Sequence, residues 1–266
     1  MTRCGLVVTT CDRPDALARV LAGVGGQTRA PDEVLVAEDG ESPATADIVR
    51  AFAAGSHAPV RHLTQPHRGF RAGRIRNAAI AATGCDYVIL VDGDMLLHPG
   101  FVEDHVALAR PGHYSQGVRI PLDVEATRRH LEARQGLPGV FDRGRVGLRR
   151  GYALRAPSLA RRLRRVANAF VAIKACNQGF WRLDLVAANG FDESMSGWGS
   201  EDKELCARLD NAGLRRQTLV FAAIAWHLAH PPAARDAAAA NRARWQATVR
   251  SGRTRCERGI DGHEAA

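Results

Sequence analysis

Two carboxylates one residue apart follow a strongly apolar run: Asp92 and Asp94 come directly after Val88–Val91. Four apolar residues in succession are typical of a strand buried on both faces, so these acids lie where the strand ends. Ligands of open α/β sheets bind beyond the carboxyl ends of the strands. Carboxylates this close repel each other unless a cation lies between them, and a divalent cation bound to a diphosphate meets that need. A solvated Asp-Gly-Asp turn explains the same residues, and both interpretations remain open at this point.

A second pair of acids, Glu201 and Asp202, opens a predicted helix that carries the apolar residues Leu205 and Leu209. Acids in a first helical turn have a simple explanation, because they complement the helix dipole. That explanation does not cover the preceding Gly-Trp-Gly, which exposes the indole of Trp198 beside two carboxylates. An aromatic ring next to acids suits a sugar-binding site.

Polar side chains follow two further predicted strands. Asp39 comes shortly after the strand expected at 33–37, where its carboxylate can accept hydrogen bonds from a ribose or a base. His227 and His230 follow the strand expected at 219–225. Histidine at a strand end is a candidate metal ligand, and a histidine packed in the core is the alternative.

Arginines are concentrated in two places. Arg71 and Arg74 lie at helical spacing in the helix expected at 71–83, where they can meet phosphate charge or remain solvated. The segment Arg143–Arg165 holds nine arginines and no acid, which accounts for the net charge of +9. Such a segment can bind a diphosphate-bearing substrate or an anionic lipid surface, or it can be a solvated loop. Nucleic acid is disfavoured, because Tyr152 is the only aromatic residue there.

Strands alternate with helices along the chain, which predicts an α/β fold with a mostly parallel central sheet flanked by helices. Ordered structure resumes after the arginine-rich segment at 169–175. The strands that we expect lie at residues 6–10, 33–37, 60–63, 88–91, 113–120 and 219–225. The helices that we expect lie at residues 14–24, 44–54, 71–83, 99–109 and 123–134, with another beginning at 201.

Composition indicates a globular protein: 45% of the 266 residues are hydrophobic. The six cysteines form no C-x-x-C pair, so we expect reduced thiols rather than a zinc site or a disulfide framework. The N-terminus lacks signal-peptide features, and no apolar run reaches the roughly 18 residues of a membrane span. We therefore expect a cytoplasmic protein, with the inner face of the cytoplasmic membrane as a second location.

The chain resembles the GT-A fold glycosyltransferases of family 2, with a galactosyltransferase-like C-terminal region. Six motifs carry the resemblance, in order and at matching spacing: VVTTCDRP (7–14), EVLVAEDG (33–40), RAGRIRNAAIAATG (71–84), VDGDM (91–95), GFDESMSGWGSEDKEL (190–205) and WHLAHP (226–231). The resemblance implies a nucleotide-sugar donor, a diphosphate held through Mn²⁺ or Mg²⁺, and inverting transfer to an acceptor hydroxyl.

The resemblance also implies roles for individual residues. Asp202 corresponds to the general base and Glu201 to the acid that binds the acceptor. Asp94 would ligate the metal, with His227 as a further ligand and His230 as its substitute. The residues that we expect to hold the donor are Thr9, Arg13, Asp39, Arg74, Asp92, Asn177 and Trp198.

We therefore expect one GT-A domain over 1–250, with a nucleotide-sugar-binding half at 1–120, an acceptor half at 121–250 and a polar tail at 251–266. The expected enzyme moves a hexosyl or N-acetylhexosaminyl group, with a UDP-sugar as donor, to a glycan or lipid-linked acceptor in lipopolysaccharide or surface-polysaccharide synthesis. The alternatives are a nucleotide-sugar-binding protein without turnover and a nucleotidyltransferase. The second alternative would need a glycine-rich phosphate loop with a lysine near the first strand, and the sequence has none there.

Overall fold

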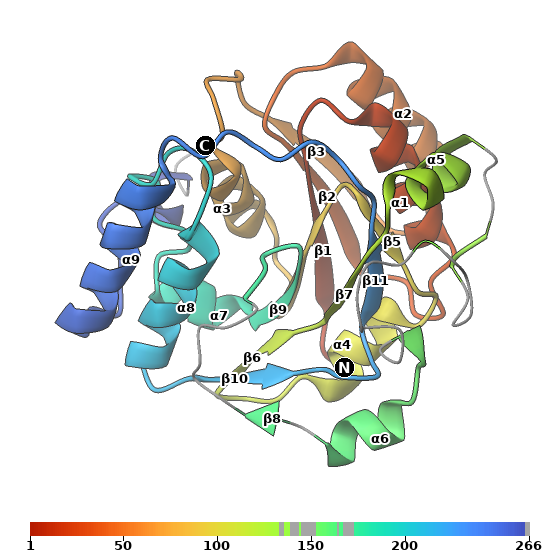
Figure 1. Cartoon of the computed structure of the whole chain (residues 1–266). Coiled ribbons are helices and arrows are strands. Elements are labelled where there is room, and N and C mark those ends of the chain that lie inside the picture. The colour runs from red at the N-terminus through yellow and green to blue at the C-terminus, as the bar shows by residue number, and fades with distance from the viewer. Residues whose placement is uncertain (133–135, 139–143, 145–152, 164, 167–172, 264–266) are drawn as a thin grey trace.

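The computed structural model describes residues 1–132, 136–138, 144, 153–163, 165–166 and 173–263. An eight-stranded sheet forms its centre, in the order β3-β2-β1-β4-β9-β6-β10-β8 (Figure 1). Its strands are β1 (Cys4–Thr10), β2 (Glu33–Glu38), β3 (Val60–Thr64), β4 (Tyr87–Asp92), β6 (His113–Gln116), β8 (Arg165–Val166), β9 (Asn177–Trp181) and β10 (Arg215–Thr218).

The first four strands of this sheet run parallel, as the alternation of strands and helices predicts. Their carboxyl ends therefore meet at one edge, where Thr9 of β1 lies opposite Asp92 of β4. Strand β9 is antiparallel to both of its neighbours, β4 and β6. The sheet is thus mostly parallel, and its parallel half holds the first acids of the predicted site.

Side chains alternate between two hydrophobic cores, one on each face of the sheet. Leu6 and Val8 of β1 enter one core, whereas Val7 between them enters the other, as the twofold period of a strand requires. The helices that contribute to the first core are α1 (Pro14–Gly25), α2 (Pro43–Gly55), α4 (Phe101–Leu108) and, through Ala160, α6 (Pro157–Arg162). The helices of the second core are α3 (Ala72–Ala82), α7 (Arg182–Ala187) and α8 (Glu201–Asn211).

A second, three-stranded sheet lies beyond the carboxyl end of β4. It consists of β5 (Met95–Leu97), β11 (Ile224–His227) and β7 (Val118–Pro121), in that order. Strand β11 is antiparallel to β5, with His227 opposite Met95. A third core, which includes Trp226, supports this sheet. The pairing of β5 with β11 brings the end of β11 beside the acids that follow β4.

Several elements differ from the sequence-based expectation. The strand expected at 113–120 is two strands, because the chain leaves one sheet for the other at Gly117, where a Cβ would collide with the side chain of Asn177. The strand expected at 219–225 begins only at Ile224, since Phe221 and Ala223 adopt positive φ values of 65° and 48°. Strand β10 was not predicted, because its sequence RRQT lacks apolar periodicity.

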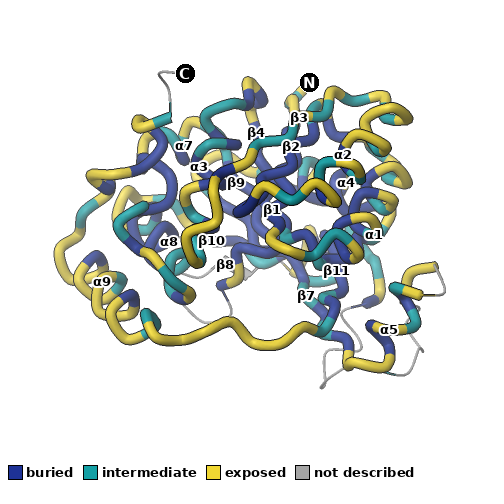
Figure 2. Tube along the Cα trace, turned by 90° about the horizontal axis from the view of Figure 1, so that it is seen from above, coloured by how far each residue is buried: buried dark blue, intermediate teal, exposed yellow. Residues whose placement is uncertain are grey.

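The remaining helices are α5 (Val124–Glu132) and α9 (Ala238–Ser251), followed by a short 3₁₀ helix, η2 (Ile260–His263). Residues 230–236 are exposed and lead across the surface from β11 to α9 (Figure 2). The tail expected at 251–266 is not merely a solvated polar segment: Cys256 and Ile260 are buried, and η2 contacts α3. Among the described residues, no helix has the length and apolar character to cross a membrane.

Parts of four expected segments lie outside the described residues. These are residues 133–134 of the helix expected at 123–134, residues 143, 145–152 and 164 of the arginine-rich segment, residues 169–172 of the ordered run expected at 169–175, and residues 264–266 of the tail expected at 251–266.

Candidate active site

A buried guanidinium joins three of the elements that form the site. Arg76 projects from α3, and its residue is only 3% exposed. Its Nε donates to Oγ1 of Thr9 at 3.1 Å, and its Nη2 donates to Oδ1 of Asp92 at 2.7 Å. Its Nη1 lies 3.9 Å from Oε1 of Glu201 at the start of α8. Arg76 therefore brings β1, β4 and α8 together at the carboxyl edge of the sheet.

Burial and the charge of Arg76 shape the pKa values at this point. Burial lowers the pKa of Arg76, but the neighbouring carboxylates of Asp92 and Glu201 outweigh that effect, and its pKa is raised. Burial raises the pKa of Asp92, and Arg76 opposes this increase. The guanidinium is thus held charged, and it lowers the free energy of placing acids so close together.

The sequence pointed to Arg74 of α3 as a donor-binding residue and did not single out Arg76. Arg74 pairs with Glu193 at 3.2 Å, and its contact with the donor stays a prediction. Arg76 lies two residues further along, on the buried side of the helix next to Ile75. Its position within the apolar face of α3 was the signal that could have identified it, since a buried arginine needs charged partners.

Three side chains that could ligate a metal ion lie together at the end of β4, the strand that contains Asp92, the partner of Arg76. Asp94 follows β4, His227 ends β11, and His230 lies three residues further along. Oδ2 of Asp94 is 3.4 Å from Nε2 of each histidine. The ligand atoms of all three residues lie within 4.8 Å of one another. The sequence predicted one histidine ligand, His227, with His230 as its substitute. In the structure, both histidines lie beside Asp94.

This donor set fits a divalent cation. Oδ1 of Asp94 is buried without a hydrogen-bond partner among the described residues, so it has the capacity to ligate. Burial raises the pKa of Asp94, but its hydrogen bond to His227 and the charges of both histidines outweigh this and hold the pKa below its usual value. One carboxylate and two imidazoles suit Mn²⁺ better than Mg²⁺, which prefers oxygen ligands.

The acids of α8 follow a tightly held turn. Ser200, which precedes the helix, has a φ of 68°. The N–H of Gly199 donates to Oε2 of Glu201 at 3.2 Å. Burial, with a further contribution from the charge of Asp202, raises the pKa of Glu201 to about 7. The two acids therefore share a site in which a proton is retained close to neutral pH.

Asp202 is positioned by backbone hydrogen bonds. Its Oδ2 accepts from the N–H of Ala175 at 3.3 Å, and its Oδ1 accepts from the N–H of Lys203 at 2.8 Å. Burial raises its pKa, while these N–H groups and the charges of Lys174 and Arg76 oppose the increase. A carboxylate with a raised pKa and a fixed orientation is suited to accept a proton.

The loop before α8 is anchored from two sides. The N–H of Gly197 donates to the carbonyl of Phe70 at 3.0 Å, and the Asn241 amide of α9 donates to the Gly197 carbonyl at 3.2 Å. Trp198 is 37% exposed, and the guanidinium of Arg235 lies 5.4 Å from its ring centre. The loop thus presents an indole next to the acids while its backbone is fixed.

The residues expected at the nucleoside lie at the ends of β1 and β2. Asp39 is 3% exposed, and its carboxylate accepts from Nε2 of Gln65 and from the N–H of Arg71, each at 2.7 Å. Arg13 pairs with Asp15 at 3.1 Å near the start of α1. Gln65 and the backbone of Arg71 were not in the sequence-based set, and they fix the orientation of Asp39.

Asn177, which the sequence predicted at the donor, is held by a buried hydrogen-bond network. Its side chain is fully buried; Oδ1 contacts Nε2 of His105 at 2.8 Å, and Nδ2 donates to the carbonyls of Val118 and Ala223. These bonds join β9 to the segments that lead into β7 and β11. Because its hydrogen-bonding groups are occupied and buried, Asn177 is excluded from the donor site that we propose below.

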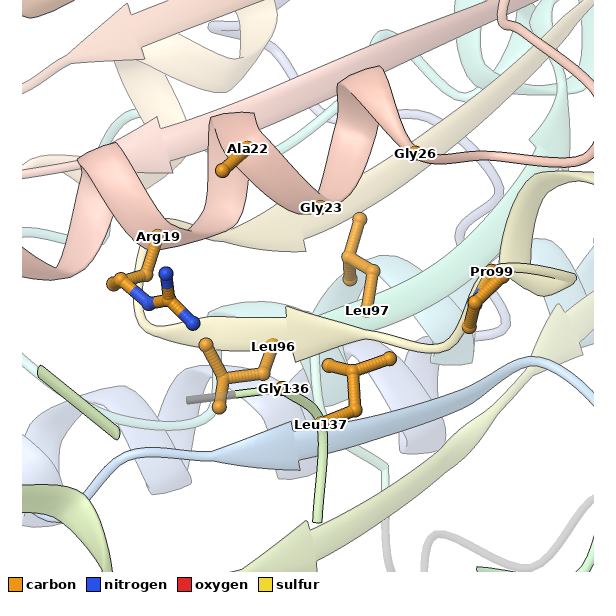
Figure 3. Close-up of a pocket in the computed structure, with 9 residues that line it drawn as sticks. All are labelled: Arg19, Ala22, Gly23, Gly26, Leu96, Leu97, Pro99, Gly136 and Leu137. Atoms are coloured by element: carbon orange, nitrogen blue, oxygen red, sulfur yellow. The ribbon is translucent and has the colours of Figure 1, made fainter. Parts of the chain in front are cut away.

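A separate cavity of about 200 Å³ lies between α1 and β5 (Figure 3). Leu96 and Leu97 form much of one wall, Arg19 lies on the α1 side, and Leu137 lies opposite. None of the candidate site residues lines it. The candidate site is therefore the open edge of the sheet, not this cavity.

Fold and site together define an α/β protein with a cluster of acids at the carboxyl edge of its mostly parallel sheet, the edge at which ligands of such sheets bind. Residues 6–168, more than half of the chain, match Glycosyl transferase family 2. Residues 161–231 match a second family model, which is described as the N-terminal domain of galactosyltransferase. The chain belongs to glycosyl transferase family 2, as its motifs predicted.

Curated relatives share about a quarter of their aligned residues with this chain. Hyaluronan synthase of Pasteurella multocida is 28% identical over 222 residues, which cover 78% of this chain and 23% of that protein. Chondroitin synthase of Escherichia coli is 27% identical over 246 residues, covering 85% of this chain and 34% of that protein. The chain thus spans about a quarter to a third of the length of these two relatives.

Solved structures confirm the fold. The crystal structure of S. aureus TarS 1-349 in complex with UDP matches with a TM-score of 0.65 at 14% identity, covering 98% of this chain and 68% of that chain. The GT-A fold expected from the sequence, with a mostly parallel central sheet flanked by helices, is therefore confirmed.

The geometry of the Asp94 cluster predicts that both histidines contribute to metal binding. We expect His227→Ala and His230→Ala each to weaken Mn²⁺ binding, measured by electron paramagnetic resonance, by at least the roughly 10- to 100-fold that loss of a supporting residue costs at metal sites. His57→Ala, which removes an exposed histidine elsewhere, is the matched control. Unchanged Mn²⁺ affinity in both histidine variants would show that this cluster is not the metal site.

Proposed function

We propose that this protein is an inverting, metal-dependent glycosyltransferase that moves a sugar from a UDP-sugar to a hydroxyl group of a glycan or glycolipid. The observation that carries the proposal is the contact of Arg76 with both Asp92 and Glu201. This contact places the acids after β4 next to the acids of α8. Donor and acceptor groups would then meet at one edge of the sheet.

Asp202 is the general base in this proposal. An acceptor hydroxyl is a poor nucleophile at neutral pH, so a carboxylate within hydrogen-bond reach must remove its proton as it attacks the anomeric carbon. The two backbone N–H groups that bind Asp202 fix its orientation, and its raised pKa makes it a stronger base than an exposed aspartate. Glu201 would bind the acceptor, and Trp198 would line the sugar pocket. Inversion needs no covalent intermediate.

The donor would bind to the other candidate residues at the carboxyl edge of the sheet. Asp39 would contact the uracil or the ribose, with Thr9 and Arg13 nearby at the end of β1. Asp92 would contact the ribose. Asp94, His227 and His230 would hold Mn²⁺, which when bound supplies electrostatic stabilisation of the diphosphate leaving group.

The names of the relatives support a polysaccharide as the product class. Hyaluronan synthase and chondroitin synthase match most of this chain, and the solved TarS structure contains UDP. A hexosyl or N-acetylhexosaminyl donor with UDP is consistent with these names. We propose an acceptor in cell-surface polysaccharide or lipopolysaccharide synthesis. A donor-binding protein without turnover is the alternative that the following experiment addresses.

Turnover of a panel of UDP-sugars with Mn²⁺ and glycosaminoglycan oligosaccharides as acceptors tests this function, with release of UDP as the measurement. We expect metal-dependent UDP release, and Asp202→Asn should reduce its rate by about 10² to 10⁴-fold, because the general base is lost. Donor affinity should be retained in Asp202→Asn and weakened in Asp94→Ala.

Asp47→Asn, an exposed carboxylate on α2, is the control and should change neither quantity. Donor binding without UDP release from any donor and acceptor pair would favour a binding protein. Full activity of Asp202→Asn would refute the assignment of the base.

We also propose that α6 contacts an anionic membrane surface. Leu154, Leu159 and Leu163 are 52%, 40% and 50% exposed, and Arg161 and Arg162 are exposed between the last two. Arginine charge complements anionic headgroups, while the leucine side chains can enter the interface. The enzyme would then act at the inner face of the cytoplasmic membrane on a lipid-linked acceptor.

Flotation with vesicles that contain an anionic lipid tests this contact. Replacing Arg161 and Arg162 with serine should weaken binding roughly thirtyfold, because each arginine near the surface contributes about 1 kcal/mol. The double variant Arg242→Ser and Arg250→Ser removes the same charge from exposed positions of α9 and should float like the wild type. Equal loss in both variants would indicate an effect of net charge alone.

A further inference from the structure

A second group of metal-ligating side chains lies away from the Asp94 cluster. Cys11 and Asp12 follow β1, and His67 follows β3. Sγ of Cys11 is 3.8 Å from Oδ2 of Asp12 and 3.8 Å from Nδ1 of His67. The three ligand atoms lie within 4.8 Å of one another. Two segments that are far apart in the sequence thus present sulfur, oxygen and nitrogen to one point.

This donor set favours zinc. In a tetrahedral site with Zn–S of about 2.3 Å and Zn–N of about 2.0 Å, neighbouring ligand atoms are about 3.5 Å apart. The observed 3.8 Å separations from the sulfur are therefore within a few tenths of an ångström of that geometry. A thiolate and an imidazole select Zn²⁺ over Mn²⁺ or Mg²⁺, and three protein ligands leave one position open.

The charge around the thiol also favours a cation. Asp12, Asp39 and Glu38 all add negative charge near Cys11. A bound Zn²⁺ would offset the negative charge and displace the thiol proton.

One hydrogen bond opposes metal binding. Nδ1 of His67 lies 3.0 Å from the backbone carbonyl of Asp39. Ligation through Nδ1 would exchange this contact for the metal bond. The loss of this one neutral hydrogen bond opposes metal binding by a small free energy compared with that of a zinc bond.

We propose that Cys11, Asp12 and His67 form a Zn²⁺ site, separate from the Asp94 cluster, with one open coordination position. A cation there joins the segment after β1 to the segment after β3, next to Asp39. The proposal goes beyond the proposed function and does not depend on catalysis.

Thiol labelling tests the site directly. Cys11 is exposed and the other five cysteines are buried, so a maleimide should label one thiol of the native protein, and peptide mapping identifies it as Cys11. We expect micromolar Zn²⁺ to slow this labelling at least tenfold in the wild type, and Mn²⁺ to leave it unchanged. His67→Ala should abolish the protection, whereas His57→Ala should retain it.

Zinc stoichiometry after dialysis gives a second readout. His67→Ala should hold one Zn²⁺ fewer than the wild type, and His227→Ala should still show Zn²⁺ protection of Cys11. Both variants change side chains outside the hydrophobic cores, so folding is checked by circular dichroism. Equal protection of Cys11 in wild type and His67→Ala, or no protection in the wild type, would overturn the proposal. Neither result would bear on glycosyl transfer.

Discussion

The buried guanidinium of Arg76 is the interaction on which the candidate active site depends. Asp92 and Glu201 come from elements far apart in the sequence, and both are acids in a largely buried place. Without a cation between them, their mutual repulsion and desolvation would favour protonation or separation. Arg76 contacts both and Thr9 as well, so one side chain of α3 fixes the relative position of β1, β4 and α8. Arg76 thus explains why several motifs that are separate in the sequence meet in the fold.

The three-stranded sheet supplies the second constraint. Asp94 precedes β5, and the pairing of β5 with β11 sets His227 and His230 beside it. The N–H of Leu228 also donates to the carbonyl of Asp94, which fixes the backbone between the histidines. Asp92 therefore contacts Arg76, whereas Asp94 contacts the two histidines, so two neighbouring acids of one strand end have different partners.

Local patterns predicted the parallel half of the fold and the acids at its strand ends. The apolar run before Asp92 and the acids that open α8 are visible in short stretches of sequence, because both follow from helix and strand periodicity. Arg76 was not singled out: its position beside the buried Ile75 was a local signal, but its partners lie on three different elements that only the fold brings together. Asn177 likewise forms hydrogen bonds to three other segments, which no local pattern indicates. Strand β10 is polar and is ordered by pairing with β6, which its own residues do not reveal.

The pH dependence of UDP release in Arg76→Met and Arg76→Lys tests the central role of this guanidinium most directly. Arg76 lowers the pKa values of Asp92, Glu201 and Asp202. Removing its charge should therefore raise these pKa values and move the acid limb of the rate profile of Arg76→Met to higher pH by about 1 unit or more, with activity partly recovered at high pH. Arg76→Lys, which keeps the charge, should move the limb less. A profile of Arg76→Met that keeps its position on the pH axis and is only lower at every pH, in a folded protein that still binds Mn²⁺, would contradict this account.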